Sequence, residues 1–579
     1  AKQSNVDVIN MSIGGLPALN DGNNTRCVVY QRLIEQSNVQ MFISAGNSGP
    51  GINTVGDPSV ATLVMSIGAY VHKDTWFNNY GAVAAKDDGI FVFSSRGPRE
   101  DGGFKPEVIA PGAAVSSIPG WQPGSPVAEA GYALPPGYGM FNGTSMAAPQ
   151  AAGAASLLVS AAKQAGVQHQ PAQLRQAMKS SARYLPYYQA VEQGNGIINV
   201  GAAWDLLKTN IKTADISSSV PVTTILSGRL ATPNVGVGIH DREGVTAGSS
   251  FTRTYTFTRN GGGTVTYNLT WVGNDGTFSS PATLALGNSA SLVVTITPAA
   301  AGLHSAILNV DDANTVGIDY QTMNTVVAAL PLNADNNFKQ TVTGSADRPD
   351  TNKPRHFFAV PVGTTMIRVT ATVLTGRMRT LRQHPFGVPL DSTSTTAYCS
   401  AGTTCQSGQP AGTIQRTFTP TASTPVVGVW EVTLDTSRTS TASPSTYSLT
   451  FESFSVTIDP TSWTEMGVTI PSTIGPKTFT ATNNGAAFTG SITGTSLTSA
   501  HEETPLTFAA GAPQQVRFID LPAGTTRLTV QIFQLPGAAA DLDLFVYDCT
   551  AGPNACVLRG QGIGSTSNET VSVTTNLTA

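Results

Sequence analysis

Ser145 has the clearest potential for chemistry in this sequence, because it stands at the start of a predicted helix. It lies in Asn142-Gly143-Thr144-Ser145-Met146-Ala147-Ala148-Pro149, which opens an Ala-rich run that ends near residue 165. The first backbone N–H groups of a helix lack intrahelical partners, and with the helix dipole they stabilise an oxyanion that forms there. A serine hydroxyl at a helix start is more commonly an N-cap. The position alone therefore does not distinguish a nucleophile from a cap.

The motif around Ser145 resembles the nucleophile signature Gly-Thr-Ser-Met-Ala-x-Pro of subtilisin-like serine peptidases. Upstream, Ser44-Ala45-Gly46-Asn47-Ser48-Gly49-Pro50 resembles the strand end and loop that place an asparagine, here Asn47, in the oxyanion hole of that family. Ser12-Ile13-Gly14-Gly15 resembles the edge to which the substrate backbone adds as a strand, and Gly194–Val200 resembles the segment that closes the domain. Since these motifs occur in the family's order, the sequence is identified as a member of the subtilases.

Within that family, further segments resemble tripeptidyl-peptidase II and its bacterial relatives. They are residues 47–56, 67–71 and 93–98, the Asn-Gly-Thr-Ser-Met form at 142–146, and the β-rich region 237–330. In those enzymes tripeptide release depends on acidic residues that lie ahead of the region matched here. The resemblance thus implies a serine peptidase and leaves endopeptidase and tripeptidyl-type activity as alternatives.

The resemblance also implies roles for individual residues. Ser145 would be the nucleophile and form an acyl-enzyme, while its backbone N–H and the side-chain amide of Asn47 would hold the oxyanion. A His polarised by an Asp would transfer the proton. The substrate would be a protein or peptide, and the residues expected to bind it are Ser12, Ile13, Gly14, Gly15, Ala45 and Gly46.

The Asp and His of the triad are not found in this sequence. In the family's order both precede the predicted strand at residues 6–13, and none of the seven histidines is followed by the glycine of the family's His-Gly-Thr motif. Two interpretations stay open. Either an upstream part of a longer reading frame supplies Asp and His, or the chain is a catalytically inactive subtilase-fold module that binds a ligand or a surface. The intact motifs at Ser145 and Asn47 favour the first, under which this chain by itself would be inactive.

The elements that must position these residues are typical of an α/β domain. Buried strands are predicted at residues 6–13, 39–45 and 63–69, and helices at residues 27–36, 143–165 and 171–181. Strands that alternate with helices predict a parallel sheet covered on both faces. The expected fold is a subtilisin-like parallel-sheet domain, incomplete at its N-terminus, followed by several all-β sandwich domains.

The sequence changes character near residue 212, where alternating polar and apolar runs between Gly, Asn and Pro turns begin to predict β-sandwiches. Arg355–Pro361 and Gln515–Pro522 follow one pattern, each with a Gly-Thr-Thr shortly after it, which indicates two related sandwiches. We expect the subtilase domain at 1–212, an Ig- or fibronectin-like sandwich at 213–333, a prepeptidase C-terminal-like sandwich at 334–452, a β linker or partial sandwich at 453–485, and a second, truncated prepeptidase C-terminal-like sandwich at 486–579.

Composition excludes some functions. Charged residues make up 12% of the chain and the formal net charge is −4, so no basic field is available to hold a nucleic acid. Apolar runs such as Ala151–Val159 are shorter than the ~20 residues needed to cross a bilayer. We therefore expect neither a nucleic-acid partner nor a membrane span.

The five cysteines comprise a lone Cys27 and two close pairs in loops, Cys399 with Cys405 and Cys549 with Cys556. Their spacing matches no zinc pattern, which favours disulfides and an extracellular, secreted protein over free thiols in a cytosolic one. Asp541 and Asp543 alternate with Leu on a predicted strand. Two carboxylates are too few to specify Ca²⁺, so a solvated face is favoured and no cofactor is expected.

Overall fold

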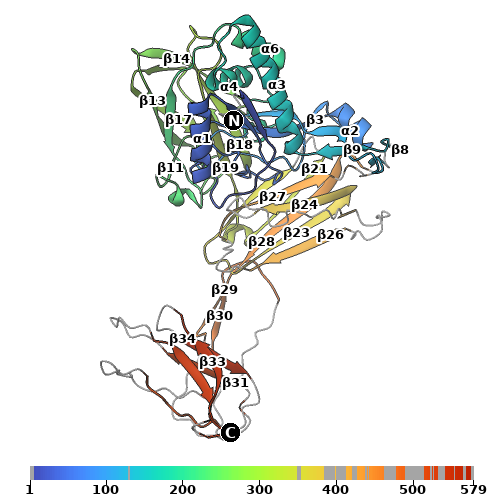
Figure 1. Cartoon of the computed structure of the whole chain (residues 1–579). Helices are drawn as coiled ribbons and strands as arrows, with labels where there is room; N and C mark the ends of the chain where they lie inside the picture. Colours follow the sequence, from blue (N-terminus) through green and yellow to red (C-terminus); the bar gives the residue numbers. More distant parts are fainter. Residues whose placement is uncertain are drawn as a thin grey trace. The chain divides into compact units, whose positions relative to one another are not determined.

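The computed structural model of the chain has two compact units, Ala1–Thr489 and Gly490–Ala579 (Figure 1). The residues that the structure describes are 6–127, 131–348, 354–383, 398–399, 412–419, 427–436, 438, 440, 442–461, 478–489, 514–521, 525, 527–532, 542–552, 555–564 and 569–574.

The first region of the larger unit is built on a mostly parallel sheet. Its strands are β1 (Val8–Met11), β2 (Gln40–Ser44), β3 (Met65–His72), β4 (Asp88–Ile90) and β5 (Val108–Pro111), in the order β1-β2-β3-β4 with β5 also paired to β3. β1, β2, β3 and β5 pair in parallel, whereas β4 runs antiparallel to β3. Every residue of β2 is buried, as expected for a strand covered on both faces.

Helices cover both faces of this sheet. The helices of this region are α1 (Thr25–Ser37), α2 (Lys73–Tyr80), α3 (Thr144–Ala165), α4 (Pro171–Ser180), α5 (Ala190–Gln193) and α6 (Val200–Leu207), of which α5 packs against the proximal sandwich described below. Phe42 of β2 packs into a cluster with α3, α4 and α6, whereas its neighbours Met41 and Ile43 pack with Cys27 and Ile34 of α1. The opposite directions of successive strand residues thus build two apolar layers.

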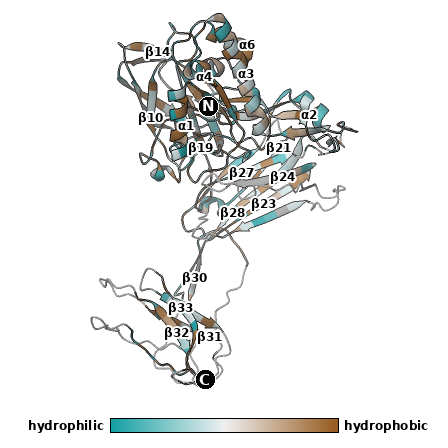
Figure 2. Cartoon of the chain, viewed as in Figure 1, coloured by the Kyte–Doolittle hydropathy of each residue, from teal (hydrophilic) through white to brown (hydrophobic). Residues whose placement is uncertain are grey.

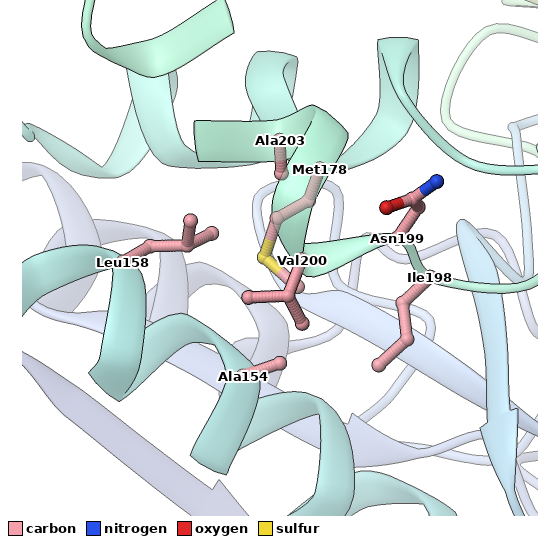
Figure 3. A pocket seen from close by; sticks show the side chains of 7 residues that line it. All are labelled: Ala154, Leu158, Met178, Ile198, Asn199, Val200 and Ala203. Atoms are coloured by element: carbon pink, nitrogen blue, oxygen red, sulfur yellow. The ribbon is translucent and has the colours of Figure 1, made fainter. Parts of the chain in front are cut away.

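A small depression lies between α3, α4 and α6, and its lining is apolar except for Asn199. Figure 3 shows Ala154 and Leu158 of α3, Met178 of α4, and Val200 and Ala203 of α6 gathered around a small apolar depression. We read it as packing between three helices.

Two hairpin-like pairs lie between β5 and α3. β6 (Ala113–Ser117) pairs antiparallel with β9 (Tyr138–Asn142), and β7 (Pro126–Val127) pairs with β8 (Tyr132–Ala133). β9 ends one residue before Gly143, which precedes the first residue of α3. The outer strand pair therefore leads directly into the predicted nucleophile.

Two sheets then pack together between residues 216 and 328, here called the proximal sandwich. One contains β11 (Val235–Gly236), β10 (Ile216–Pro221), β13 (Phe251–Arg259), β17 (Ser289–Ile296) and β15 (Phe278–Ser279); the other contains β12 (His240–Asp241), β19 (Tyr320–Ala328), β18 (Gly302–Asp311), β14 (Val265–Val272) and β16 (Thr283–Leu286). The 3₁₀ turn η3 (Ser227–Arg229) follows β10. Tyr255 and Phe257 of one sheet share a core with Leu308 and Val326 of the other.

A second pair of sheets, here called the distal sandwich, spans residues 330–454. One sheet contains β20 (Leu330–Pro331), β22 (Arg355–Val360), β27 (Gly428–Thr436), β24 (Arg377–Gln383) and β25 (Tyr398–Cys399); the other contains β21 (Lys339–Ala346), β28 (Ser445–Phe454), β23 (Met366–Thr375) and β26 (Thr413–Phe418). The 3₁₀ turn η4 (Ala334–Asn336) lies between β20 and β21. Apolar and polar residues alternate along β23 (Figure 2), so that Ile367 and Val369 are buried while Arg368 is half-buried.

Short pairs complete the described chain. β29 (Val456–Asp459) pairs with β30 (Thr480–Asn483) in the larger unit. In the smaller unit β31 (Arg527–Ile532) pairs with β34 (Glu569–Thr574), and β32 (Leu544–Asp548) pairs with β33 (Val557–Gly562). The domain boundaries expected above stay predictions.

A disulfide joins Cys549 to Cys556, and Cys27 is a buried free thiol. The other predicted pair lies outside the described residues, since Cys405 is not among them. Asp541 also lies outside them, and among the described residues no group of three or more His, Cys, Asp or Glu could hold a metal ion. Of the helices in the described part of the chain, none is long and apolar enough to cross a membrane.

Candidate active site

Asn47 lies in the loop that follows β2, and its amide is held in one orientation. Its Oδ1 accepts hydrogen bonds from the backbone N of Thr144 at 3.0 Å and from the Thr144 hydroxyl at 2.9 Å. An amide presents its acceptor and its donors on opposite sides, so these two bonds leave Nδ2 facing away from Thr144. The side chain of Asn47, which is predicted to hold an oxyanion, therefore has a fixed orientation.

Ser145 is not an N-cap. α3 begins at Thr144, its N-cap residue is Gly143, and no side chain makes a capping hydrogen bond there. Ser145 is therefore the second helical residue and is half-buried. Of the two roles open from its sequence position, the cap is excluded.

The space beside Gly143 is where the two expected oxyanion donors meet. A Cβ added to Gly143 would lie 3.5 Å from Asn47 Nδ2 and 3.5 Å from the backbone N of Ser145. Both nitrogens thus lie next to the position that a side chain at residue 143 would occupy. Gly143 also has φ of +156°, a conformation that L side chains rarely adopt.

Thr144 is a site residue that the sequence interpretation missed. Its hydroxyl donates to Asn47 Oδ1 and accepts from the backbone N of Gly46 at 3.2 Å, and its side chain is fully buried. One hydroxyl therefore fixes both the loop and the amide that the loop carries. Its place between Gly143 and Ser145 was the available signal, but nothing in the sequence indicated its partners.

The predicted substrate edge lies beside Ser145. The Ser12 hydroxyl donates to the backbone O of Ser145 at 2.8 Å, and the Ile13 side chain is 64% exposed. Gly15 exchanges backbone hydrogen bonds with Asp57, and a Cβ on Gly14 would lie 2.8 Å from the Asp57 carbonyl oxygen. The edge is thus held close to a loop that leaves no room for a side chain at Gly14.

Ala45 and Gly46 directly follow β2. Ala45 is fully buried, its N donates to Ile67 O, and its O accepts from Gly56 N. Gly46 is half-buried, with its N bonded to Thr144 and its O accepting from Ser95 N. Both residues are fixed through their backbones, and their part in substrate binding stays a prediction.

Cys27 lies near the substrate edge but is unsuited to act as a nucleophile. Its Sγ is 3.5 Å from Asp57 Oδ1. Burial, together with the neighbouring carboxylate of Asp57, raises the pKa of the thiol to about 11. The thiol therefore stays protonated at neutral pH.

The histidines in the described part of the chain have partners of their own. His72 caps α2 by accepting from Asp74 N, and His169 contacts Val167 O. His240, His304 and His356 belong to strands of the two sandwiches. His384 and His501 lie outside the described residues.

Comparison with known proteins identifies the first domain. Residues 1–201 match the model of the subtilase family, Peptidase S8, and residues 217–328 match that of the Ig-like domain in actinomycete serine proteases. Residues 1–201 are a subtilase domain. The fold is therefore a subtilase domain followed by β-rich domains, as the sequence predicted.

Individual subtilases similar to the chain are longer than it. Pyrolysin from Pyrococcus furiosus is 30% identical over 409 residues, which are 63% of this chain and 27% of pyrolysin. Tripeptidyl-peptidase 2 from Caenorhabditis elegans is 35% identical over 204 residues, covering 35% of this chain and 14% of that protein. The crystal structure of tripeptidyl peptidase 2 matches with a TM-score of 0.56 and 22% identity over 78% of this chain and 35% of that one. That structural match supports the fold of the subtilase region together with its β-domains.

Proposed function

We propose that this protein is a serine peptidase in which Ser145 attacks the carbonyl carbon of a peptide bond. The observation that carries the proposal is the convergence of Asn47 Nδ2 and Ser145 N on the space beside Gly143. Two fixed donors in one place suit the negative charge that develops on the carbonyl oxygen during acyl transfer. The buried hydroxyl of Thr144 adds support, because it orients the Asn47 amide before substrate binds.

The chemistry follows from these positions. Attack by Ser145 Oγ forms a tetrahedral intermediate, whose oxyanion accepts hydrogen bonds from Asn47 Nδ2 and Ser145 N. Collapse of the intermediate releases the amine and leaves an acyl-enzyme that water hydrolyses. The substrate backbone would lie along Ser12–Gly15, since the Ser12 hydroxyl touches the backbone of Ser145.

We place the Asp and His of the triad upstream of this sequence in the full-length protein. The subtilase order is Asp, His, Ser, and the chain spans about a quarter of pyrolysin and less of tripeptidyl-peptidase 2. A base at that point would take the proton from Ser145 Oγ and then give it to the nitrogen of the leaving amine. By this reasoning the chain alone is inactive.

We also propose that the protein is secreted. The loop disulfide between Cys549 and Cys556 and the match to an Ig-like domain of actinomycete serine proteases support this location. Intact-mass measurement of protein purified from culture medium, with and without reductant, would test it. Exclusive recovery from the cytosol with free Cys549 and Cys556 would contradict it.

Fluorophosphonate labelling of the full-length protein tests the catalytic role. We expect an adduct that peptide mass spectrometry locates at Ser145 and that Ser145→Ala abolishes. Ser160→Ala, a substitution in the same helix, is the matched control and should label as the unaltered protein does. A folded full-length protein that gains no adduct at Ser145 would instead support the inactive binding module.

A further inference from the structure

The loop that carries Asn47, residues 46–54 and here called the Asn47 loop, is tied to the distal sandwich. The carbonyl oxygen of Pro50 accepts a hydrogen bond from Arg355 Nη1 at 2.9 Å, 305 positions away in sequence. The backbone N of Ile52 donates to Glu431 Oε2 at 3.1 Å, 379 positions away. Arg355 and Glu431 stand on the paired strands β22 and β27.

The remaining backbone contacts of the Asn47 loop come from the subtilase domain. Ser48 N donates to the Ser95 hydroxyl at 3.0 Å, and Gly49 N donates to Phe93 O at 2.9 Å. On the returning side, Asn53 N and Thr54 N donate to Gly97 O and Arg96 O. The middle of the loop, at Pro50 and Ile52, is thus held by the distal sandwich. A buried backbone group without a partner costs about as much as a lost hydrogen bond, so Arg355 and Glu431 stabilise the loop at Pro50 and Ile52.

The two side chains belong to a buried network of alternating charge. Arg355 Nη1 is 2.6 Å from Glu431 Oε1, and Arg355 Nη2 is 3.3 Å from Glu192 Oε1, which also accepts from Arg96 Nε at 3.0 Å. The side chains of Arg96 and Glu431 are 0% exposed and that of Arg355 is 8% exposed. Buried ion pairs of this kind demand close geometry, because loss of one member leaves an uncompensated charge. The network therefore holds Pro50 and Ile52 in one place.

Apolar packing fixes the same point. Ile52 is fully buried in a cluster that includes Phe357 and Val429 of the distal sandwich and Ile307 and Met323 of the proximal sandwich. Residues from the subtilase domain and both sandwiches thus share one core around the Asn47 loop. Close-packed interiors transmit displacement, so a shift of β22 or β27 would be felt at Ile52.

The distal sandwich is also connected, through Tyr80, to the segment that precedes Ser145. Arg438 Nη1 donates to Tyr80 O at 3.0 Å, and the Tyr80 hydroxyl accepts from Asn142 Nδ2 at 3.1 Å. Asn142 directly precedes Gly143. The two segments beside the proposed oxyanion space, the Asn47 loop and residues 142–143, are therefore both connected to the distal sandwich.

We propose that Arg355 and Glu431 are positioning residues for Asn47, so that the distal sandwich completes the oxyanion site of the subtilase domain. This inference rests on the proposed function, since it assigns Asn47 a part in catalysis. Neither residue touches substrate; both act by holding the loop from which Asn47 projects. An oxyanion donor must be held within about 0.5 Å of its productive position, which gives such a support a direct effect on rate.

A double-mutant cycle in the full-length protein tests the inference, with the rate of fluorophosphonate labelling at Ser145 as the readout. We expect Asn47→Ala to slow labelling on the order of 10²–10³-fold, as for an oxyanion donor of subtilisin, a member of the same family. Arg355→Lys keeps the charge but loses the planar fork, and should slow labelling roughly tenfold. In the Asn47→Ala background the same change should cost less than about twofold, because the group that it positions is gone.

The matched control is Arg368→Lys, an identical change within the distal sandwich. Arg368 Nε donates to Glu452 Oε2 at 2.7 Å on the neighbouring strand β28. Its labelling rate should stay within about twofold of the unaltered protein. If Arg355→Lys fails to fold by circular dichroism, Glu431→Gln replaces it, since the single amide oxygen can no longer accept from both Ile52 N and Arg355 Nη1.

The outcomes separate the two proposals. Normal labelling by folded Arg355→Lys or Glu431→Gln, or an undiminished loss in the Asn47→Ala background, would overturn the positioning role and leave the peptidase assignment intact. Normal labelling by Asn47→Ala would reject the oxyanion role of Asn47 itself. A loss that disappears in the Asn47→Ala background is the result that supports the inference.

Discussion

The Asn47 loop and the segment 113–142 approach the same serine, and they are built in opposite ways. In the Asn47 loop Asn47 is exposed, whereas Pro50, Ile52 and Thr54 are buried and each makes a hydrogen bond to another part of the chain or of the loop. In the segment 113–142, the side chains of Trp121, Tyr138 and Phe141 are 81%, 49% and 39% exposed. One side of the proposed site is fixed by two sandwiches, whereas the other presents aromatic surface to solvent.

This difference in exposure indicates which part of the proposed reaction involves the Asn47 loop and which involves the segment 113–142. Stabilising a transition-state charge requires donors that do not rearrange. Asn47 is itself exposed, and the burial of residues 50–54 together with the hydrogen bonds from Thr144 to its amide gives that rigidity. Exposed aromatic groups on a loop segment suit contact with varied substrates, or simply cover the segment itself. Substitutions on the two sides should therefore differ sharply in their effect on rate.

The largest effect is expected from filling the space beside Gly143. In Gly143→Ala the added Cβ lies 3.5 Å from both proposed donors and forces a side chain into φ of +156°. We expect fluorophosphonate labelling of Ser145 in the full-length protein to fall by roughly 100-fold or more, because the oxyanion can no longer sit between Asn47 Nδ2 and Ser145 N.

Gly153→Ala is the matched control for that substitution. Gly153 lies within α3, and its added Cβ would meet nothing within 4 Å. Alanine is favoured over glycine in a helix interior by about 1 kcal/mol, so the variant should label normally and unfold at a slightly higher temperature. Equal labelling by Gly143→Ala and Gly153→Ala would reject the proposed oxyanion space.

A smaller effect is expected from loosening the Asn47 amide. Thr144→Val keeps the shape of the buried side chain but removes the hydroxyl that bonds Asn47 Oδ1 and Gly46 N. We expect labelling to slow roughly tenfold, since the backbone N of Thr144 still holds Oδ1. Thr144→Ser restores the hydroxyl and should recover most of the rate. Equal rates for the Val and Ser variants would show that the hydroxyl does not orient the amide.

The sequence predicted the part of the site that is local to each element. The buried strand at 39–45 and the helix at 143–165 correspond to β2 (Gln40–Ser44) and α3 (Thr144–Ala165), and periodic apolar residues and the Ala-rich run were sufficient signals. The sequence was sufficient to predict a strand that ends just before Asn47 and a helix that starts just before Ser145. Their meeting was expected only from the resemblance to subtilases.

The support from the distal sandwich could not be predicted. The sequence indicated only that Arg355 belongs to a strand pattern shared with residues 515–522. Nothing in that pattern indicates a contact with Pro50. Apolar and polar residues alternate in the sequence around Glu431, which predicts that its side chain is exposed. The side chain is instead buried, and tertiary packing alone determines its partners. The role of Thr144 was missed for the same reason, because its hydrogen bonds join segments 97 and 98 positions apart.

The stability of the proximal sandwich should depend on pH near neutrality, because it contains a paired histidine. The ion pairs that hold the Asn47 loop consist of arginines and glutamates. His304 Nδ1 is 2.6 Å from Asp275 Oδ2. Burial opposes a charge on the ring, but hydrogen bonds to Asp275 and to the carbonyl oxygen of Ala300 outweigh it and raise the pKa of His304. Burial also opposes the charge on Asp275, whose pKa is nevertheless lowered to about 2 by hydrogen bonds from His304 and Thr277.

The direction of the pH dependence follows from these pKa shifts. The stabilisation from His304 is complete below its unfolded pKa of about 6.5 and is lost as the pH rises through the higher folded pKa. That from Asp275 is present above its unfolded pKa and is lost as the pH falls toward 2. In urea unfolding, the unaltered protein should therefore exceed His304→Gln in midpoint by more at pH 5.5 than at pH 8. A constant difference across this range would contradict the pairing.

The smallest effect is expected on the exposed side of the site. Trp121 is 81% exposed, so Trp121→Ala removes little buried surface and should change the free energy of unfolding by less than about 0.5 kcal/mol. Labelling of Ser145 by a small fluorophosphonate should stay within about twofold, since the oxyanion donors come from Asn47 and the start of α3. Labelling rate and unfolding midpoint, measured beside Gly143→Ala, check both expectations. A loss of labelling as large as that of Gly143→Ala would mean that the segment 113–142 helps to hold the nucleophile, and the contrast between the rigid and the open side of the site would disappear.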